Sequence, residues 1–154
     1  MSWFIEMITN PFIIIGVSSW MWAQVIKFFL HAIINKRFDF SRLFGDGGMP
    51  SGHSATVVSV AVLSGFVYGF ASFHFALAAI FATIVCHDAT GVRRETGKQA
   101  VLLNEIVKSF EEMFSSEQLP EVKLKEFVGH TPIQVGAGIL LGIVNSIIMY
   151  NLLV

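Results

Sequence analysis

The segment over residues 47–54, Gly-Gly-Met-Pro-Ser-Gly-His-Ser, has the residue types that bind and cleave a phosphate ester. Glycines let the backbone approach an anion closely, and Ser51 can cap a helix that begins directly after it. The first N–H groups of such a helix point at one position, where the helix dipole also favours a phosphate. His53 would lie in this first turn, where it can protonate a leaving oxygen. Taken alone, the segment is equally typical of a glycine-rich turn with a serine cap.

Other polar residues lie at the ends of apolar segments. Lys27 stands inside the first segment, and a charged side chain costs about 2.5–3.5 kcal/mol at a membrane centre, so it usually faces a polar interior. Asp88 precedes Arg93 and Arg94 at the end of the third segment, and arginine presents a planar fork that matches two phosphate oxygens. His130 lies just before the fourth apolar segment. Alternatively, Lys27 extends its amine to the membrane surface, an arginine contacts lipid headgroups, and His130 is only a neighbour of a helix cap.

These residues all lie at the same end of their segments, so a bundle can bring them together at one membrane face. Two histidines, several cations and a helix start suit phosphoryl transfer. One histidine would attack phosphorus, the other would protonate the leaving alcohol, and the cations would neutralise the phosphate oxygens. The sequence has no carboxylate cluster and no Cys/His pairs at the spacing of a metal site. We therefore expect metal-independent chemistry with no cofactor.

The composition indicates a membrane protein. Hydrophobic residues make up 54% of the 154 residues and charged residues 14%, against about 45–50% and about 25% in soluble domains. Four apolar segments, at about 11–34, 53–71, 73–88 and 132–154, are candidate spans, since about 20 residues cross a hydrocarbon core. We expect an all-α integral membrane four-helix bundle, forming one domain over residues 1–154. The net charge of −1 gives no sign of a nucleic-acid partner.

Local signals mark where two of these helices begin and how one of them packs. Asn10 followed by proline is a typical helix start, and Thr131 with Gln134 forms a capping box at the fourth segment. Gly138 and Gly142 have the four-residue spacing that allows helices to approach closely. This contact would form either inside the bundle or between the copies of a homo-oligomer.

The basic residues predict the orientation in the membrane. All ten Lys and Arg lie between Lys27 and Lys125, and the N-terminus, the hairpin at 69–74 and the C-terminus contain none. An even number of spans places both termini and the hairpin on one side of the membrane. The basic connections share the other side, which the positive-inside rule makes cytoplasmic in a plasma membrane protein. An anion-binding site would also need these cations on whichever side it faced.

The third connection, residues 89–130, is long enough for its own structure. Apolar residues recur at helical spacing over about 99–114, and charged residues occupy the opposite face. We expect an additional amphipathic helix that lies on the membrane surface, as a lid over the site.

The order of these motifs resembles that of a known family. Pro-Ser-Gly-His at 50–53, preceded by Lys27 and followed by an arginine and then a histidine, resembles the type-2 phosphatidic acid phosphatase superfamily. The segments at 47–54, 88–94 and 129–132 are similar, more specifically, to its divergent branch of small membrane proteins. The resemblance extends from about Gln24 to Ile143.

The resemblance implies roles for these residues. His130 would be the nucleophile that forms a phosphohistidine, and His53 would be the general acid. The residues that would hold the phosphate are Lys27, Ser51, Gly52, and Arg93 or Arg94. Three features differ from the wider superfamily. No Arg-Pro pair follows Lys27, and Arg37 or Arg42 matches that arginine only loosely. Arg94 lies 36 residues before His130, much farther than is usual there, and position 134 is Gln rather than Asp. Asp88 or Gln134 would then orient His130.

The expected function is a membrane phosphatase that releases phosphate from a lipid phosphate. A cytoplasmic site favours phosphatidylglycerophosphate as the substrate, and phosphatidate and polyprenyl phosphates or diphosphates are alternatives. The second hypothesis is a non-catalytic protein that binds an anionic lipid, which Gln134 and the altered arginine spacing would support.

Overall fold

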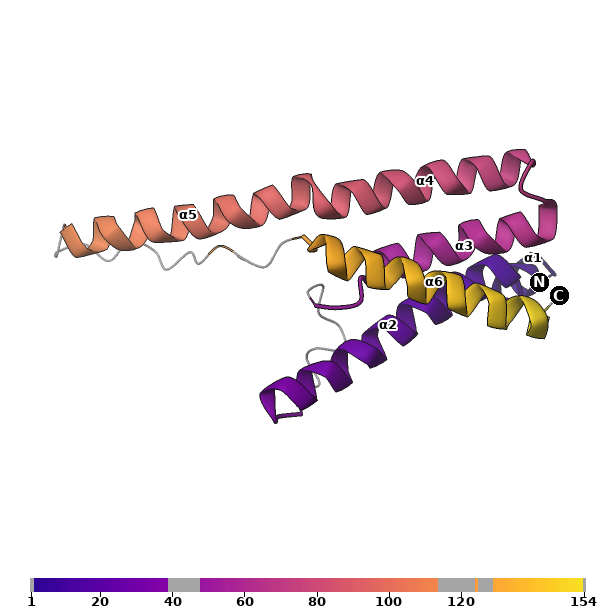
Figure 1. Ribbon diagram of the computed structural model, residues 1–154, viewed down its shortest axis with the longest axis horizontal. Coiled ribbons are helices and arrows are strands. Elements are labelled where there is room, and N and C mark those ends of the chain that lie inside the picture. Colours follow the sequence, from indigo (N-terminus) through magenta and orange to yellow (C-terminus); the bar gives the residue numbers. More distant parts are fainter. Residues whose placement is uncertain (1, 39–47, 114–123, 125–128, 154) are drawn as a thin grey trace.

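The computed structural model describes residues 2–38, 48–113, 124 and 129–153, without the side chains of residues 92, 93, 111, 112 and 153. Within these ranges the chain is all-helical, as the sequence predicts (Figure 1). The helices are α1 (Ser2–Ile8), α2 (Pro11–Asn35), α3 (Gly52–Tyr68), α4 (Phe73–Thr90), α5 (Val92–Met113) and α6 (Pro132–Leu153). The short helix α1 was not expected, and α3 ends at Tyr68 rather than near residue 71.

Capping side chains define the helix starts. Asn10 accepts a hydrogen bond from the Phe12 N–H at 2.9 Å, and Ser51 accepts one from the Ser54 N–H at 3.3 Å. The predicted capping box at α6 is also present, since Thr131 and Gln134 exchange hydrogen bonds through side chain and backbone. These bonds satisfy N–H groups that the first turn of a helix leaves without partners.

Helix α3 lies at the centre of the bundle and packs against α2, α4 and α6, while α2 also contacts α6. The α3–α6 contact depends on the predicted glycine pair. A Cβ atom at Gly138 would lie 2.5 Å from the carbonyl oxygen of Ser51, and one at Gly142 would lie 2.7 Å from that of Ala55. The pair is therefore used inside the bundle.

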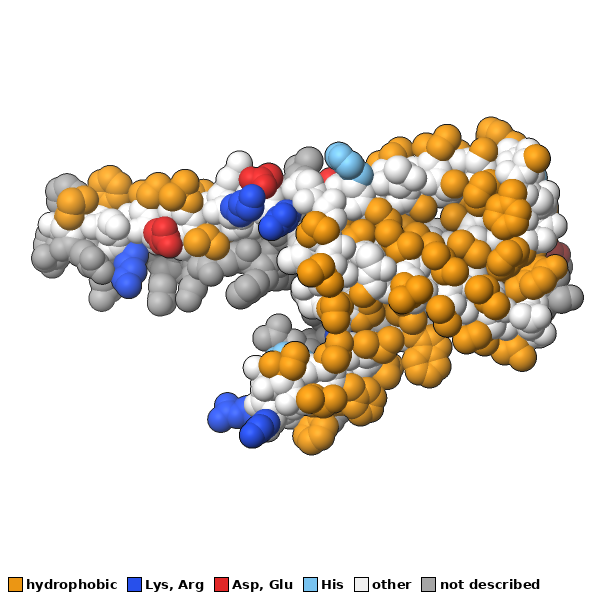
Figure 2. Space-filling model, viewed as in Figure 1, with side chains coloured by type: hydrophobic (Ala, Val, Ile, Leu, Met, Phe, Trp, Pro, Cys, Tyr) orange, Lys and Arg blue, Asp and Glu red, His pale blue; other side chains and the backbone are white. Residues whose placement is uncertain are grey.

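In the described part of the chain, three stretches are long and apolar enough to cross a membrane: Pro11–Asn35, Phe73–Phe110 and Pro132–Leu152. Helix α3 has 17 residues, which rise about 26 Å and nearly match a hydrocarbon core of about 30 Å. Both termini and the α3–α4 turn lie at one end of the bundle (Figure 1). Lys and Arg side chains gather at the other end and along α5, whereas the bundle surface is largely hydrophobic (Figure 2).

Helix α5 is the additional helix that the sequence predicts in the third connection, but its start and its position differ from the expectation. It begins at Val92 instead of about residue 99 and runs nearly in line with α4, beyond the rest of the bundle (Figure 1). Gly91 joins the two helices, because its N–H donates to the carbonyl oxygens of His87 and Asp88 and its own carbonyl oxygen accepts from the backbone N–H groups of Arg94 and Glu95. Among the described elements α5 contacts only α4, so it does not form the expected lid. Residue 114, the end of the expected helix, lies outside the described residues.

Candidate functional site

Two histidines that lie far apart in the sequence, His53 and His130, come close together at the basic end of the bundle. His53 lies in the first turn of α3, His130 lies just before α6, and their ring centroids are 6.2 Å apart with ring planes at 54°. His130 is buried, with 4% of its surface exposed, whereas His53 is exposed. One ring is therefore sheltered and the other is open to incoming groups.

Backbone and side-chain contacts position His130. Its N–H donates to the carbonyl oxygen of Ala89 at 2.9 Å, which fastens the start of α6 to the end of α4. Its ring nitrogen Nδ1 lies 3.4 Å from Oε1 of Gln134, and the same oxygen accepts the Thr131 N–H at 2.9 Å. Gln134 is thus both a helix cap and a neighbour of the histidine ring. Asp88, half-buried, precedes Ala89 in α4.

The starts of α3 and α6 are also joined directly. The Ser51 N–H donates to the carbonyl oxygen of Gln134 at 2.9 Å. The Ser51 hydroxyl is the N-cap of α3 and also accepts from the hydroxyl of Ser54 at 3.0 Å. Ser51 and Ser54 are fully buried. Because one residue links both helix starts, the two histidines are held by the same small set of bonds.

Lys27 lies beside the start of α3. Its side chain is buried, with 6% exposed. A Cβ atom at Gly52 would lie 3.8 Å from the Lys27 amine nitrogen, and one at Gly48 would lie 3.8 Å from the lysine Cγ and Cδ. The N–H groups of Gly52 and His53 form none of the hydrogen bonds found among the described residues. A buried cation next to a helix start is a favourable environment for a phosphate.

The two predicted arginines are less closely tied to this site. Arg94 is exposed in the first turn of α5, and its N–H donates to the Gly91 carbonyl oxygen at 3.0 Å. The Arg93 side chain lies outside the described part of the structure. Within that described part, no group of three or more His, Cys, Asp and Glu side chains could hold a metal ion.

Two residues of α2 were not identified as site residues from the sequence. Trp20 covers the start of α3, since a Cβ atom at Gly52 would lie 3.2 Å from its ring. Gln24 is buried, and its Oε1 forms no hydrogen bond with the described residues. A buried acceptor without a donor costs about 1–3 kcal/mol. The sequence signal for Gln24 is its position three residues before Lys27, which places both on one helix face. Trp20 has no such signal in the sequence, since tryptophan is common at membrane interfaces.

The chain belongs to the Divergent PAP2 family, which matches residues 8–145. It is similar to the Uncharacterized membrane protein YuiD of Bacillus subtilis (strain 168), with 37% identity over 152 residues that cover 94% of this chain and 96% of that protein. No solved structure matches the chain. Together with its apolar helices, these similarities identify it as an integral membrane protein of this family.

Proposed function

We propose that this member of the Divergent PAP2 family is a phosphatase that releases inorganic phosphate from a lipid phosphate through a phosphohistidine, without a metal ion. The observation that carries the proposal is the pair of His53 and His130, with ring centroids 6.2 Å apart. Reacting atoms approach to about 3–3.5 Å before bond formation. A phosphoryl group between the rings would therefore have a nucleophile on one side and an acid on the other.

In the first step, a ring nitrogen of His130 attacks phosphorus, and the bond between phosphorus and the lipid oxygen breaks. His53 gives its proton to that oxygen, and the lipid alcohol leaves. In the second step, His53 takes a proton from water, the resulting hydroxide attacks phosphorus, and the phosphorus–nitrogen bond breaks. The burial of His130 supports its role as nucleophile, since a sheltered ring meets fewer competing water molecules.

The cations and the start of α3 would bind the phosphate oxygens. Lys27 supplies a buried positive charge beside Gly52, and the N–H groups at the α3 start supply donors that Ser51 positions as N-cap. Arg93 or Arg94 would contact the phosphate from the start of α5. Gln134 would orient His130 through the 3.4 Å contact with Nδ1, while Asp88 is the alternative.

We further propose phosphatidylglycerophosphate as the preferred substrate and a cytoplasmic site in a plasma membrane. The support for this orientation is that Lys and Arg gather at the histidine end of the bundle, whereas both termini lie at the other end (Figures 1 and 2). Phosphatidate and polyprenyl phosphates or diphosphates are the alternative substrates.

The test is phosphate release by the detergent-purified protein from these lipids, with and without EDTA. We expect EDTA-resistant release that is lost in His130→Ala and His53→Ala. His87→Ala is the matched control and should retain the activity, because His87 is an exposed histidine in the last turn of α4, at the same end of the bundle as the site. Full activity in His130→Ala would refute the phosphohistidine, and loss under EDTA would refute metal independence. Lipid binding without release from any substrate would identify an anionic-lipid-binding protein instead.

A further inference from the structure

An apolar groove runs along the bundle from His53 toward the opposite end. Helices α2 and α4 both pack against α3, but among the described residues they do not pack against each other. Helix α3 therefore forms the floor of the groove, and α2 and α4 form its walls. Two adjoining cavities, of about 420 and 630 Å³, occupy it and share Thr56, Val57 and Phe81.

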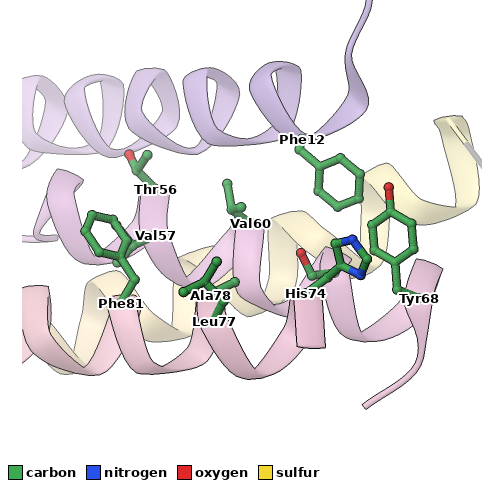
Figure 3. A pocket seen from close by; sticks show the side chains of 10 residues that line it. Phe12, Thr56, Val57, Val60, Tyr68, His74, Leu77, Ala78 and Phe81 are labelled. Atoms are coloured by element: carbon green, nitrogen blue, oxygen red, sulfur yellow. The ribbon is translucent and has the colours of Figure 1, made fainter. Parts of the chain in front are cut away.

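The groove is lined for a hydrocarbon chain. His53 and Trp20 line the end nearest the site, and the middle is lined mostly by aliphatic and aromatic side chains (Figure 3). Thr56 is the polar residue that both cavities share, and its hydroxyl already donates to the carbonyl oxygen of Gly52 at 2.9 Å. An alkyl or isoprenyl chain in the groove would therefore leave no unpaired donor at this position.

Aromatic rings from all three helices lie at the far end. Tyr68 of α3 stacks against Phe12 of α2 with centroids 5.5 Å apart, and against His74 of α4 with centroids 4.3 Å apart (Figure 3). We call these three residues the ring cluster. Helix α3 rises about 22 Å from His53 to Tyr68, at 1.5 Å per residue. The groove thus extends through most of the membrane thickness and ends at a barrier that all three helices build.

Building on the proposed function, we propose that this groove holds one hydrocarbon tail of the substrate, and that the ring cluster sets the longest tail that fits. Continuity with His53 identifies the occupant, because a lipid whose phosphate lies between the histidines has its tail at the groove entrance. A tail that leaves the bilayer for the groove gains little hydrophobic energy, since both surroundings are apolar. Selection among tails must therefore come from fit, and carbons beyond the ring cluster must bend out.

The first experiment measures kcat/KM for lipid phosphates with a graded series of tail lengths, in one acyl set and one isoprenyl set. We expect the wild type to discriminate against tails above a limit, and Tyr68→Ala to raise kcat/KM for those tails by about tenfold. Phe73→Ala is the matched control, because Phe73 lies at the same end, is 76% exposed and does not line the groove. An unchanged length profile in Tyr68→Ala would overturn the proposal.

The second experiment requires no turnover. A lipid phosphate with a photoreactive diazirine at the tail end is incorporated with His130→Ala in bilayer vesicles, and labelled residues are identified by mass spectrometry. We expect labels at Leu77, Ala78 and the ring cluster, and loss of these labels in Val57→Trp, which fills the middle of the groove.

A control lipid with the same tail but no phosphate separates the outcomes. Equal labelling by this neutral lipid would show that bulk bilayer lipid fills the groove and would overturn the proposal, as would labelling outside the groove or on a second copy of the chain. Phosphate-dependent labelling of the groove in a protein that releases no phosphate would support the tail site and refute only the proposed phosphatase.

Discussion

Gly138 offers a test of how the α3–α6 contact determines the histidine geometry. Its Cα faces the Ser51 carbonyl so closely that a Cβ atom would lie 2.5 Å from that oxygen, and 3.0 Å from the Ser54 side chain. Cβ atoms essentially never lie closer than 3.0 Å to another heavy atom, and contacts of 3.0–3.4 Å are already tight. To move from 2.5 Å into this range, the starts of α3 and α6 must separate by about 0.5–0.9 Å in Gly138→Ala. Ser51 belongs to the start of α3, and His130 is fixed to the start of α6.

The expected magnitude follows from this displacement. A misplacement of about 1 Å at a reacting centre costs about 10²-fold in rate, so Gly138→Ala should lower kcat/KM by about ten- to a hundredfold. Overpacking should also destabilise the fold by about 1–3 kcal/mol. Gly136→Ala is the matched control on the same helix, because nothing lies within 4 Å of a Cβ atom there. Alanine also has the higher helix propensity, by about 1 kcal/mol.

The assay measures phosphate release and thermal unfolding on the same detergent-purified samples. Gly142→Ala extends the series, because its Cβ atom would meet the Ala55 carbonyl at 2.7 Å, one turn farther from the histidines. We expect it to lower the unfolding temperature as Gly138→Ala does, but to retain more activity. Wild-type unfolding and wild-type kcat/KM in Gly138→Ala would refute the reasoning.

Substitutions at three other positions test individual roles at the site. Gln134→Leu removes the contact with His130, so kcat should fall by about tenfold with KM unchanged. Gln134→Glu should retain much of the wild-type kcat, because a carboxylate can accept the same hydrogen bond. Lys27→Met should raise KM for lipid phosphates by about tenfold or more while Lys27→Arg retains partial binding, as steady-state kinetics would show. Arg94→Ala should raise KM by about tenfold. Lys98→Ala is the control and should leave KM unchanged, because Lys98 is exposed and pairs with Glu95 at 2.6 Å. Equal effects of the two substitutions on KM would contradict a specific phosphate contact by Arg94.

The helices and their starts could be predicted because the signals are local. A cap such as Asn10 or Thr131 bonds to a backbone group two or three residues away, so neighbouring residues carry the information. The glycine spacing of α6 likewise predicts a close contact, although the sequence could not distinguish packing inside the bundle from packing between copies. The structure locates the partner of that contact as the backbone of α3.

Features that depend on several helices at once could not be predicted. The groove exists because α2 and α4 stay apart on α3, and no spacing within one segment encodes that separation. The position of Trp20 over Gly52 depends on the same packing. Helix α5 was expected to lie back over the site because its pattern is amphipathic. It lies instead nearly in line with α4 (Figure 1), and Gly91 forms hydrogen bonds with the last turn of α4 and the first turn of α5.

The long separation between the arginines and His130 does not prevent a common site. The His130 N–H bonds to the Ala89 carbonyl oxygen at 2.9 Å, so the chain leaves α4 and returns to the same point whatever lies between. Closing a longer flexible loop costs only about 0.6 kcal/mol for each doubling of its length. One backbone hydrogen bond, with the packing of α6 on α3, can offset several doublings. The start of α6 therefore stays beside the end of α4 despite the long connection, because its position depends on the fastened helix ends rather than on the length of chain between them.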